Sequence, residues 1–165
     1  MLVGRTYLVL ALGDIAQELA DVIVVAGAPH GSCPTGEAVI SNAGSLPARY
    51  LVHAVGPAWQ GGTMGEAGLL RRAYLNSLSL AAEYGAATIA IAPISTGSYP
   101  IEKAAPAALG AARDFAMGNQ QFREIRFVLA NERDLSVYRQ ALGALPLDLP
   151  AAPAGRGTRV CPTTG

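Results

Sequence analysis

The chain has 165 residues, enough for one domain with a sizeable core, and its 51% hydrophobic and 15% charged residues are typical of a globular protein. Twelve basic residues balance twelve acidic ones, so we expect no general binding to nucleic acid and none to an anionic membrane. A small anionic ligand held by backbone N–H groups is compatible with this balance.

The N-terminal residues and the cysteines indicate a cytoplasmic protein. The apolar stretch before Asp14 is too short to span a membrane. It also lacks the succession of a charged, an apolar and a small-residue region that marks a signal peptide. Cys33 and Cys161 are isolated from each other, which predicts reduced thiols, with neither a disulfide framework nor zinc spacing. We expect no metal and no cofactor.

The hydrophobic pattern predicts strands that alternate with helices. Short apolar or β-branched runs predict strands at residues 7–12, 20–25, 37–41, 50–55, 88–94 and 125–130. Helical periodicity predicts helices at residues 66–84, 101–117 and 133–145. Gly85 stands where a left-handed cap belongs, and Pro106 either kinks the second helix or marks its start. This order favours an α/β fold with a mainly parallel sheet flanked by helices.

The C-terminal segment differs from the rest in composition. Residues 146–165 contain four of the eleven prolines and no periodicity, which is typical of a disordered tail. The expected organisation is therefore one domain over residues 1–145 followed by a Pro-rich tail.

A small polar turn follows the predicted strand at residues 88–94 and precedes a helix. Its residues are Ser95, Thr96, Gly97, Ser98 and Tyr99. Exposed backbone N–H groups in such a turn, with the positive end of the next helix, can hold a phosphate without lysine or arginine. The alternative stays open, because any α/β protein needs small polar residues where a strand meets a helix.

Five segments, in order, resemble motifs of the macro domain, an α/β fold that binds ADP-ribose and includes O-acetyl-ADP-ribose deacetylases. The matching segments are Gly13-Asp14-Ile15 and residues 33–38 (CPTGEA), 50–59 (YLVHAVGPAW), 69–78 (LLRRAYLNSL) and 95–100 (STGSYP). The resemblance covers residues 7–145 and implies a three-layer α/β/α macro-like fold with a mixed, mainly parallel sheet.

The resemblance implies roles for the matched positions. Asp14, beside Ile15, would accept a hydrogen bond from the adenine amine, although a helix N-cap or a turn is an equal alternative without the family. Residues 95–99 would cradle the diphosphate through backbone N–H groups, and Tyr99 either shapes this loop or covers the core. Asn131 could touch adenine, but a polar residue that closes a strand is the stronger interpretation.

The chain departs from the family at the catalytic segment. Val25-Ala26-Gly27-Ala28 stands where the family has NAAN, and a glycine-rich loop with a catalytic aspartate is missing, with on the order of 30 residues absent. Valine and alanine can neither hold a ribose by hydrogen bonds nor accept a proton, so no catalytic residue is assigned. Ala130 stands where an aromatic side chain would stack on adenine, a loss worth about 1–3 kcal/mol.

These residues predict a degenerate macro domain that binds ADP-ribose or a related nucleotide weakly, with little or no hydrolysis. An active ADP-ribosyl hydrolase or O-acetyl-ADP-ribose deacetylase, with His30 or a water in place of the lost groups, is the alternative. A scaffold without a ligand is the third interpretation. ADP-ribosylated protein and a second copy of the chain are further candidate partners.

Two histidines are candidates for a rival site. His30 and Cys33 have the spacing of half a metal site or of a thiol–imidazole pair, but a plain loop is the stronger interpretation. His53 lies inside a predicted strand and is expected to be a core histidine rather than a base.

The shortened connector predicts an uncovered surface. The strand at residues 22–25 is apolar on both faces and needs cover on both. The connector at residues 26–36 is too short and too rich in glycine and proline for a covering helix. We therefore expect either self-association through this face or a lower stability than that of an intact macro domain.

Overall fold

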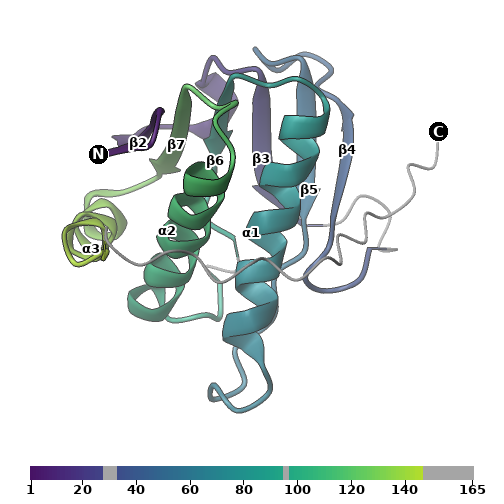
Figure 1. The fold of residues 1–165 in the computed structure, drawn as a ribbon. Coiled ribbons are helices and arrows are strands. Elements are labelled where there is room, and N and C mark those ends of the chain that lie inside the picture. The colour runs from purple at the N-terminus through teal and green to yellow at the C-terminus, as the bar shows by residue number, and fades with distance from the viewer. Residues whose placement is uncertain (28–32, 95–96, 147–165) are drawn as a thin grey trace.

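The computed structural model describes residues 1–27, 33–94 and 97–146. Within these ranges seven strands form one sheet in the order β1-β2-β7-β6-β3-β5-β4 (Figure 1). The strands are β1 (Leu2–Val3), β2 (Thr6–Leu12), β3 (Val22–Ala26), β4 (Ala38–Asn42), β5 (Tyr50–Ala54), β6 (Thr88–Ile91) and β7 (Glu124–Leu129). Strands β2, β7, β6, β3 and β5 are parallel, and β1 and β4 pair antiparallel at the edges. The predicted mixed, mainly parallel sheet is confirmed.

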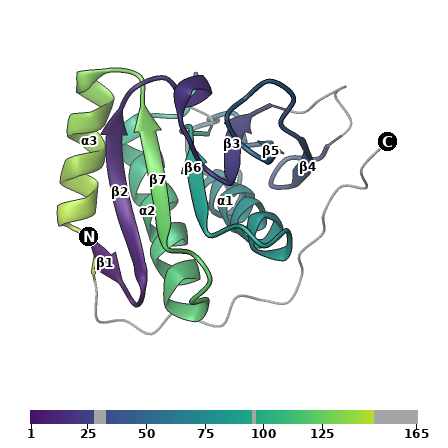
Figure 2. The same ribbon diagram turned by 90° about the horizontal axis from the view of Figure 1, so that it is seen from above.

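The α-helices of the described chain pack together on one face of the sheet (Figures 1 and 2). They are α1 (Glu66–Glu83), α2 (Ile101–Gly118) and α3 (Glu132–Gly143). The ring centroid of Phe127 on β7 lies 6.1 Å from that of Tyr74 on α1 and 5.7 Å from that of Tyr138 on α3. These aromatic contacts join two helices to the middle of the sheet and to each other.

The predicted helices form with small differences at their ends. The stripe that predicted α1 is fully buried and consists of Leu70, Tyr74, Leu78 and Ala81. Gly85 has a φ of 78°, and its N–H donates to the carbonyl of Ala82 at 3.0 Å, so it caps α1 as predicted. Pro106 lies inside α2 and does not mark its start.

Some short elements differ from the prediction. Strand β6 ends at Ile91 rather than at residue 94, because Pro93 has no N–H and the N–H of Ile94 donates to the Tyr74 hydroxyl at 2.8 Å. Strand β1 and the 3-10 helix η1 (Ile15–Gln17) were not predicted, since two or three residues are too few to show a period.

The opposite face of the sheet is covered by short segments. Ile23 on β3 is buried with Ala90 and Val128 in a separate apolar cluster. Four of the side chains that cover this cluster are Ile15, Ala20, Leu46 and Ala48. Ile23 is 1% exposed, so the predicted gap over β3 is closed there, whereas Val25 is half-buried. In the described residues the second outer layer therefore consists of η1 and loops rather than an α-helix.

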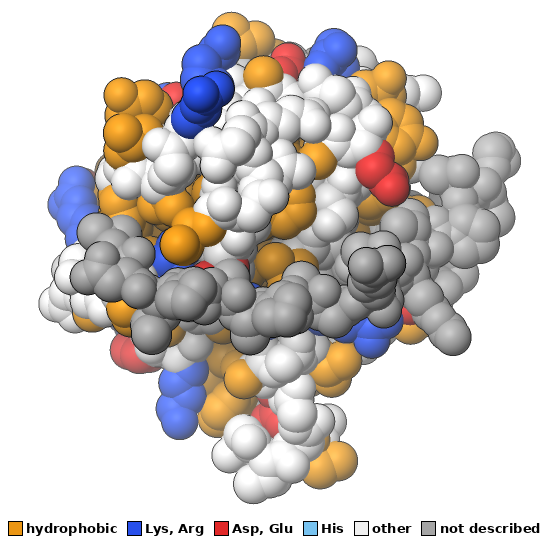
Figure 3. Space-filling view, in the orientation of Figure 1, with side chains coloured by type: hydrophobic (Ala, Val, Ile, Leu, Met, Phe, Trp, Pro, Cys, Tyr) orange, Lys and Arg blue, Asp and Glu red, His pale blue; other side chains and the backbone are white. Residues whose placement is uncertain are grey.

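The surface agrees with the balanced charge. On the face that carries the helices, basic and acidic side chains are scattered and do not gather into one basic patch (Figure 3). No helix of the described chain is both long and apolar enough to span a membrane. The predicted tail lies outside the described residues, apart from Pro146, whose carbonyl accepts a hydrogen bond from Arg113.

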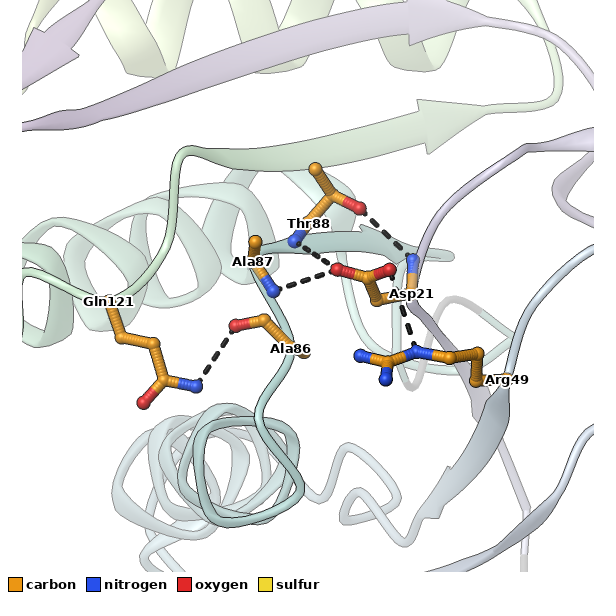
Figure 4. Close-up of polar contacts among 6 residues, drawn as sticks. All are labelled: Asp21, Arg49, Ala86, Ala87, Thr88 and Gln121. Carbon is orange, nitrogen blue, oxygen red and sulfur yellow. Dashed lines mark hydrogen bonds and ion pairs between the residues drawn. The ribbon is translucent and has the colours of Figure 1, made fainter.

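Asp21 joins the amino ends of neighbouring strands β3 and β6 (Figure 4). Its Oδ2 accepts hydrogen bonds from the N–H groups of Ala87 at 2.8 Å and Thr88 at 3.1 Å. Arg49 Nε lies 3.6 Å from its Oδ1, and the N–H of Asp21 donates to Thr88 Oγ1 at 3.0 Å. Burial alone would raise the pKa of Asp21, but these hydrogen bonds and Arg49 outweigh it and lower the pKa.

We predict that Asp21→Asn lowers the free energy of unfolding at pH 7 by about 1 kcal/mol or more, because neutral hydrogen bonds replace charge-assisted ones. The folded-state pKa is lowered, so the contribution of the carboxylate is complete near neutral pH and is lost as the pH falls through that pKa. In urea unfolding, the difference between wild type and variant should shrink from about pH 5 to about pH 3.

The control for this measurement is Glu83→Gln, which removes an exposed carboxylate at the end of α1. It should change the free energy of unfolding by less than about 0.5 kcal/mol at every pH. A difference between wild type and Asp21→Asn that stays constant with pH would contradict the role given to the charge.

Candidate functional site

The carboxyl ends of β2, β6 and β7 meet at a cavity of about 520 Å³. Open α/β sheets bind ligands outside the carboxyl ends of their strands, and this volume is within the ordinary range for a small-ligand site. Its lining includes Gly13, Asp14, Ile15, Pro93, Ala130 and Asp134. Two predicted ligand residues, Asp14 and Ile15, therefore lie in one cavity with Ala130.

Asp14 both caps η1 and lines the cavity. Its Oδ1 accepts a hydrogen bond from the N–H of Ala16 at 3.0 Å, which confirms the N-cap interpretation. A carboxylate has about four lone-pair sites, so one capping bond leaves acceptor capacity for a ligand amine. The cap also fixes the side chain, and a fixed acceptor is what selective recognition of an amine requires.

Asn131 caps α3 and holds Asp134 at the cavity. Its Oδ1 accepts a hydrogen bond from the N–H of Asp134 at 2.9 Å, and its Nδ2 donates to Asp134 Oδ2 at 3.1 Å. The described contacts of Asn131 are thus those of a residue that closes β7 and begins a helix. Asp134 itself lines the cavity and places a second carboxylate there.

The predicted phosphate loop is described only in part, because Ser95 and Thr96 lie outside the described residues. Gly97 and Ser98 are exposed. A Cβ on Gly97 would have no heavy atom within 4 Å beyond its chain neighbours, so a ligand has room to approach this backbone. The loop leads into the first turn of α2, whose N–H groups carry the positive end of the helix dipole.

Tyr99 lies in the core and not at the surface of the loop. It is 3% exposed, and its ring centroid is 4.8 Å from that of Trp59. Burial raises the pKa of Tyr99, and the negative charge of Glu66 raises it further. The structure therefore agrees with Tyr99 as a residue that covers the core, and its effect on the phosphate loop stays a prediction.

A second cavity of about 350 Å³ lies between the first turns of α2 and α3. Its lining includes Tyr99, Glu102 and Arg133, and it shares Asp134 with the first cavity. Arg133 Nη2 is 3.9 Å from Glu102 Oε1, with both side chains exposed. The two cavities therefore lie next to each other, with Asp134 in the lining of both.

Of the rival residues, Cys33 and His53 are described, and neither lines one of these two cavities. His30 lies outside the described residues, and Cys33 is half-buried as a free thiol. His53 is half-buried on β5, and burial lowers its pKa, which agrees with a core histidine. In the part of the chain that the structure describes, no three His, Cys, Asp or Glu residues are grouped so as to hold a metal ion.

Sequence reasoning missed Asp134 and Pro93 as lining residues. Asp134 comes three residues after Asn131 and falls in the first turn of a predicted helix, a spacing that signals an N-cap pair. Pro93 closes a strand, which signals that its chain leaves the sheet there. Neither signal shows that the two residues face the cavity that Asp14 lines.

Comparison with known proteins places these features in a family. The sequence pattern described as "Macro domain" matches residues 13–108. A macro domain-containing protein of Caldanaerobacter subterraneus is 48% identical over 125 residues, which are 74% of this chain and 71% of the relative. A protein of Citrobacter rodentium named O-acetyl-ADP-ribose deacetylase is 41% identical over 127 residues, 76% of this chain and 72% of the relative.

Solved structures agree with this match. The Oceanobacillus iheyensis macrodomain with ADP superposes with a TM-score of 0.78 at 28% identity, over 87% of this chain and 94% of that one. The Trypanosoma brucei macrodomain in complex with ADP-ribose gives a TM-score of 0.73 at 27% identity, over 82% of this chain and 69% of that one. The chain therefore belongs to the macro domain family.

Proposed function

We propose that the chain binds ADP-ribose or a closely related nucleotide, with adenine in the cavity at Asp14 and the diphosphate at residues 95–99. The observation that carries this proposal is that Asp14 and Ile15 line a cavity at the carboxyl ends of β2, β6 and β7. The loop after β6 exposes Gly97 and Ser98 in front of the first turn of α2, where backbone N–H groups suit a phosphate. Two solved relatives hold ADP or ADP-ribose, which supports the choice of ligand.

The affinity is expected to be modest. Ala130 lines the cavity but has no ring to stack on a base, and such stacking is worth about 1–3 kcal/mol. That loss corresponds to a dissociation constant that is larger by roughly tenfold to a hundredfold. Free ADP-ribose and ADP-ribosylated protein both present the same adenosine diphosphate group to this site.

We propose further that hydrolysis is slight or absent. Val25 and Ala26 end β3, and neither side chain can donate or accept a hydrogen bond. The N–H of Gly27 donates to the carbonyl of Ala54 at 2.9 Å, so this N–H is used in pairing with β5. The alternative is an active deacetylase, which the name of the Citrobacter relative favours. It would need His30 or an ordered water in place of the side chains that the chain lacks.

We predict that Asp14→Ala weakens ADP-ribose binding about tenfold to a hundredfold in calorimetric titration, since a hydrogen bond to a charged group is lost. Wild type should also prefer ADP-ribose over its hypoxanthine analogue, which presents a carbonyl in place of the amine, and Asp14→Ala should lose that preference. Thermal melting accompanies the titration, because the variant also loses the cap of η1.

Glu132→Ala is the matched control for charge, because Glu132 is an exposed acid in the first turn of α3. It should leave both affinities unchanged. Tight ADP-ribose binding that Asp14→Ala does not alter would mean that adenine lies elsewhere.

A separate prediction concerns catalysis. Incubation with O-acetyl-ADP-ribose, or with a mono-ADP-ribosylated protein, should release no product above the rate of a buffer control, because no described side chain at the end of β3 can activate water. Chromatography of the products measures this release. Release that depends on the protein and disappears in His30→Ala would establish the enzyme alternative.

A further inference from the structure

Glu66 is a buried carboxylate that touches neither cavity. It is the first residue of α1 and only 2% exposed. An ionised carboxylate in such a place is costly unless hydrogen bonds compensate for the lost water. Burial alone would raise the pKa of Glu66, but hydrogen bonds from backbone N–H groups outweigh it and lower the pKa. The side chain therefore remains charged at neutral pH and is held by the backbone around it.

The carboxylate of Glu66 organises the loop that precedes α1. Its Oε2 accepts from the N–H groups of Gln60 at 3.1 Å and Gly62 at 2.7 Å, and its Oε1 accepts from the N–H of Met64 at 2.5 Å. Gly62 has a φ of 86°, and a Cβ there would lie 2.9 Å from Trp59 Cη2. The loop is thus wound round the carboxylate with its backbone against the ring of Trp59.

Trp59 in turn contacts the chain that follows the predicted phosphate loop. Its backbone N–H donates to Ser98 Oγ at 3.3 Å, and its ring packs on that of Tyr99. Lys103 Nζ, in the first turn of α2, lies 5.1 Å from the centroid of the Trp59 ring. Trp59 therefore contacts three residues between Ser98 and the beginning of α2.

Helix α1 also holds the chain that precedes the predicted phosphate loop. The hydroxyl of Tyr74, fully buried on α1, accepts the N–H of Ile94 at 2.8 Å. Without Tyr74 this N–H would be buried and unpaired, because β6 has already ended at Ile91. Helix α1 thus secures the chain on both sides of the loop, directly at Ile94 and through Trp59 at Ser98.

We infer that Glu66 is a positioning residue for the anion end of the proposed site, defined here as Gly97, Ser98 and the first turn of α2. It acts through Trp59, which contacts Ser98, Tyr99 and Lys103. The choice of ligand in this inference rests on the proposed function, whereas the claim that Glu66 fixes the backbone near Ser98 does not. Backbone N–H groups bind an anion well only when they are already held in place, and neighbouring residues must fix them. Glu66 supplies that fixation from outside the two cavities.

Glu66→Gln tests the inference, since the amide has the shape of the carboxylate but offers one acceptor oxygen and no charge. Calorimetry should show binding of ADP-ribose weakened about tenfold and binding of adenosine, which has no diphosphate, unchanged. Amide hydrogen exchange should become faster at residues 97–103 and stay unchanged at residues 7–12. The emission of Trp59, the one tryptophan in the sequence, should shift as its packing loosens.

Glu83→Gln, an exposed carboxylate on the same helix, is the matched control and should change none of these measurements. Unaltered exchange at residues 97–103 in Glu66→Gln would overturn the inference, as would an equal rise in exchange throughout the protein. If Glu66→Gln does not fold, Trp59→Phe tests the next contact in the series, because it leaves the carboxylate in place and removes part of the ring that packs on Tyr99. The readouts are then exchange at residues 97–103 and the two titrations, since Trp59 is the one tryptophan in the sequence, and unaltered exchange there would overturn the inference.

The two proposals fail separately in this experiment. Wild type that binds neither adenosine nor ADP-ribose would contradict the proposed function, while the exchange data would still decide whether Glu66 fixes residues 97–103. If wild type binds ADP-ribose and a folded Glu66→Gln binds it with the same affinity, the proposed function stands. The positioning role of Glu66 is then overturned.

Discussion

The fold depends on covering both faces of a largely parallel sheet, although the α-helices of the described residues lie on one face only. Parallel strands carry apolar side chains on both faces, and β3 shows this clearly, with Val22 and Val24 in the main core and Ile23 in the second cluster. Leaving a side chain such as Ile23 in water would forfeit roughly 1.5–3 kcal/mol. In the described residues, η1 and the loop before β5 supply this cover, through residues such as Ile15 and Leu46.

Some of the residues that cover this face of the sheet also line the proposed ligand site. Ile15 packs against the second cluster and also lines the larger cavity, while Asp14 begins η1 and faces the same cavity. Packing of η1 against the sheet therefore fixes the position of the carboxylate that would select the base. In the proposal above, the anion end is held from the other face, since α1 packs in the main core. The two ends of the proposed site would thus depend on opposite faces of one sheet.

The sequence predicted the helices and strands better than the tertiary contacts between them. The period of α1 and its Gly85 cap are both visible in the structure, because an 18-residue amphipathic helix repeats its pattern several times. The extent of β6 was predicted wrongly, since its end depends on Tyr74, a residue twenty positions away in the sequence. Sequence pattern placed Asp14 beside a strand end, but the approach of Asp134 is a tertiary contact between β2 and α3. Cover of Ile23 by Leu46 was likewise invisible, because isolated apolar residues in loops show no period.

The charges around the site divide it into two unlike ends. The described lining of the larger cavity contains two carboxylates, Asp14 and Asp134, and no lysine or arginine. Such a lining favours groups that donate hydrogen bonds, as the amine of a base and the hydroxyls of a ribose do, and it repels phosphate. Gly97 and Ser98 carry no charge and precede the positive end of α2, where Glu102 is paired with Arg133 at 3.9 Å, so that side is more favourable to an anion than the larger cavity. A ligand with donors at one end and a diphosphate at the other would therefore enter in a single orientation. That selectivity would come from local geometry in a chain whose formal net charge is zero, and it would need no long-range attraction of the ligand.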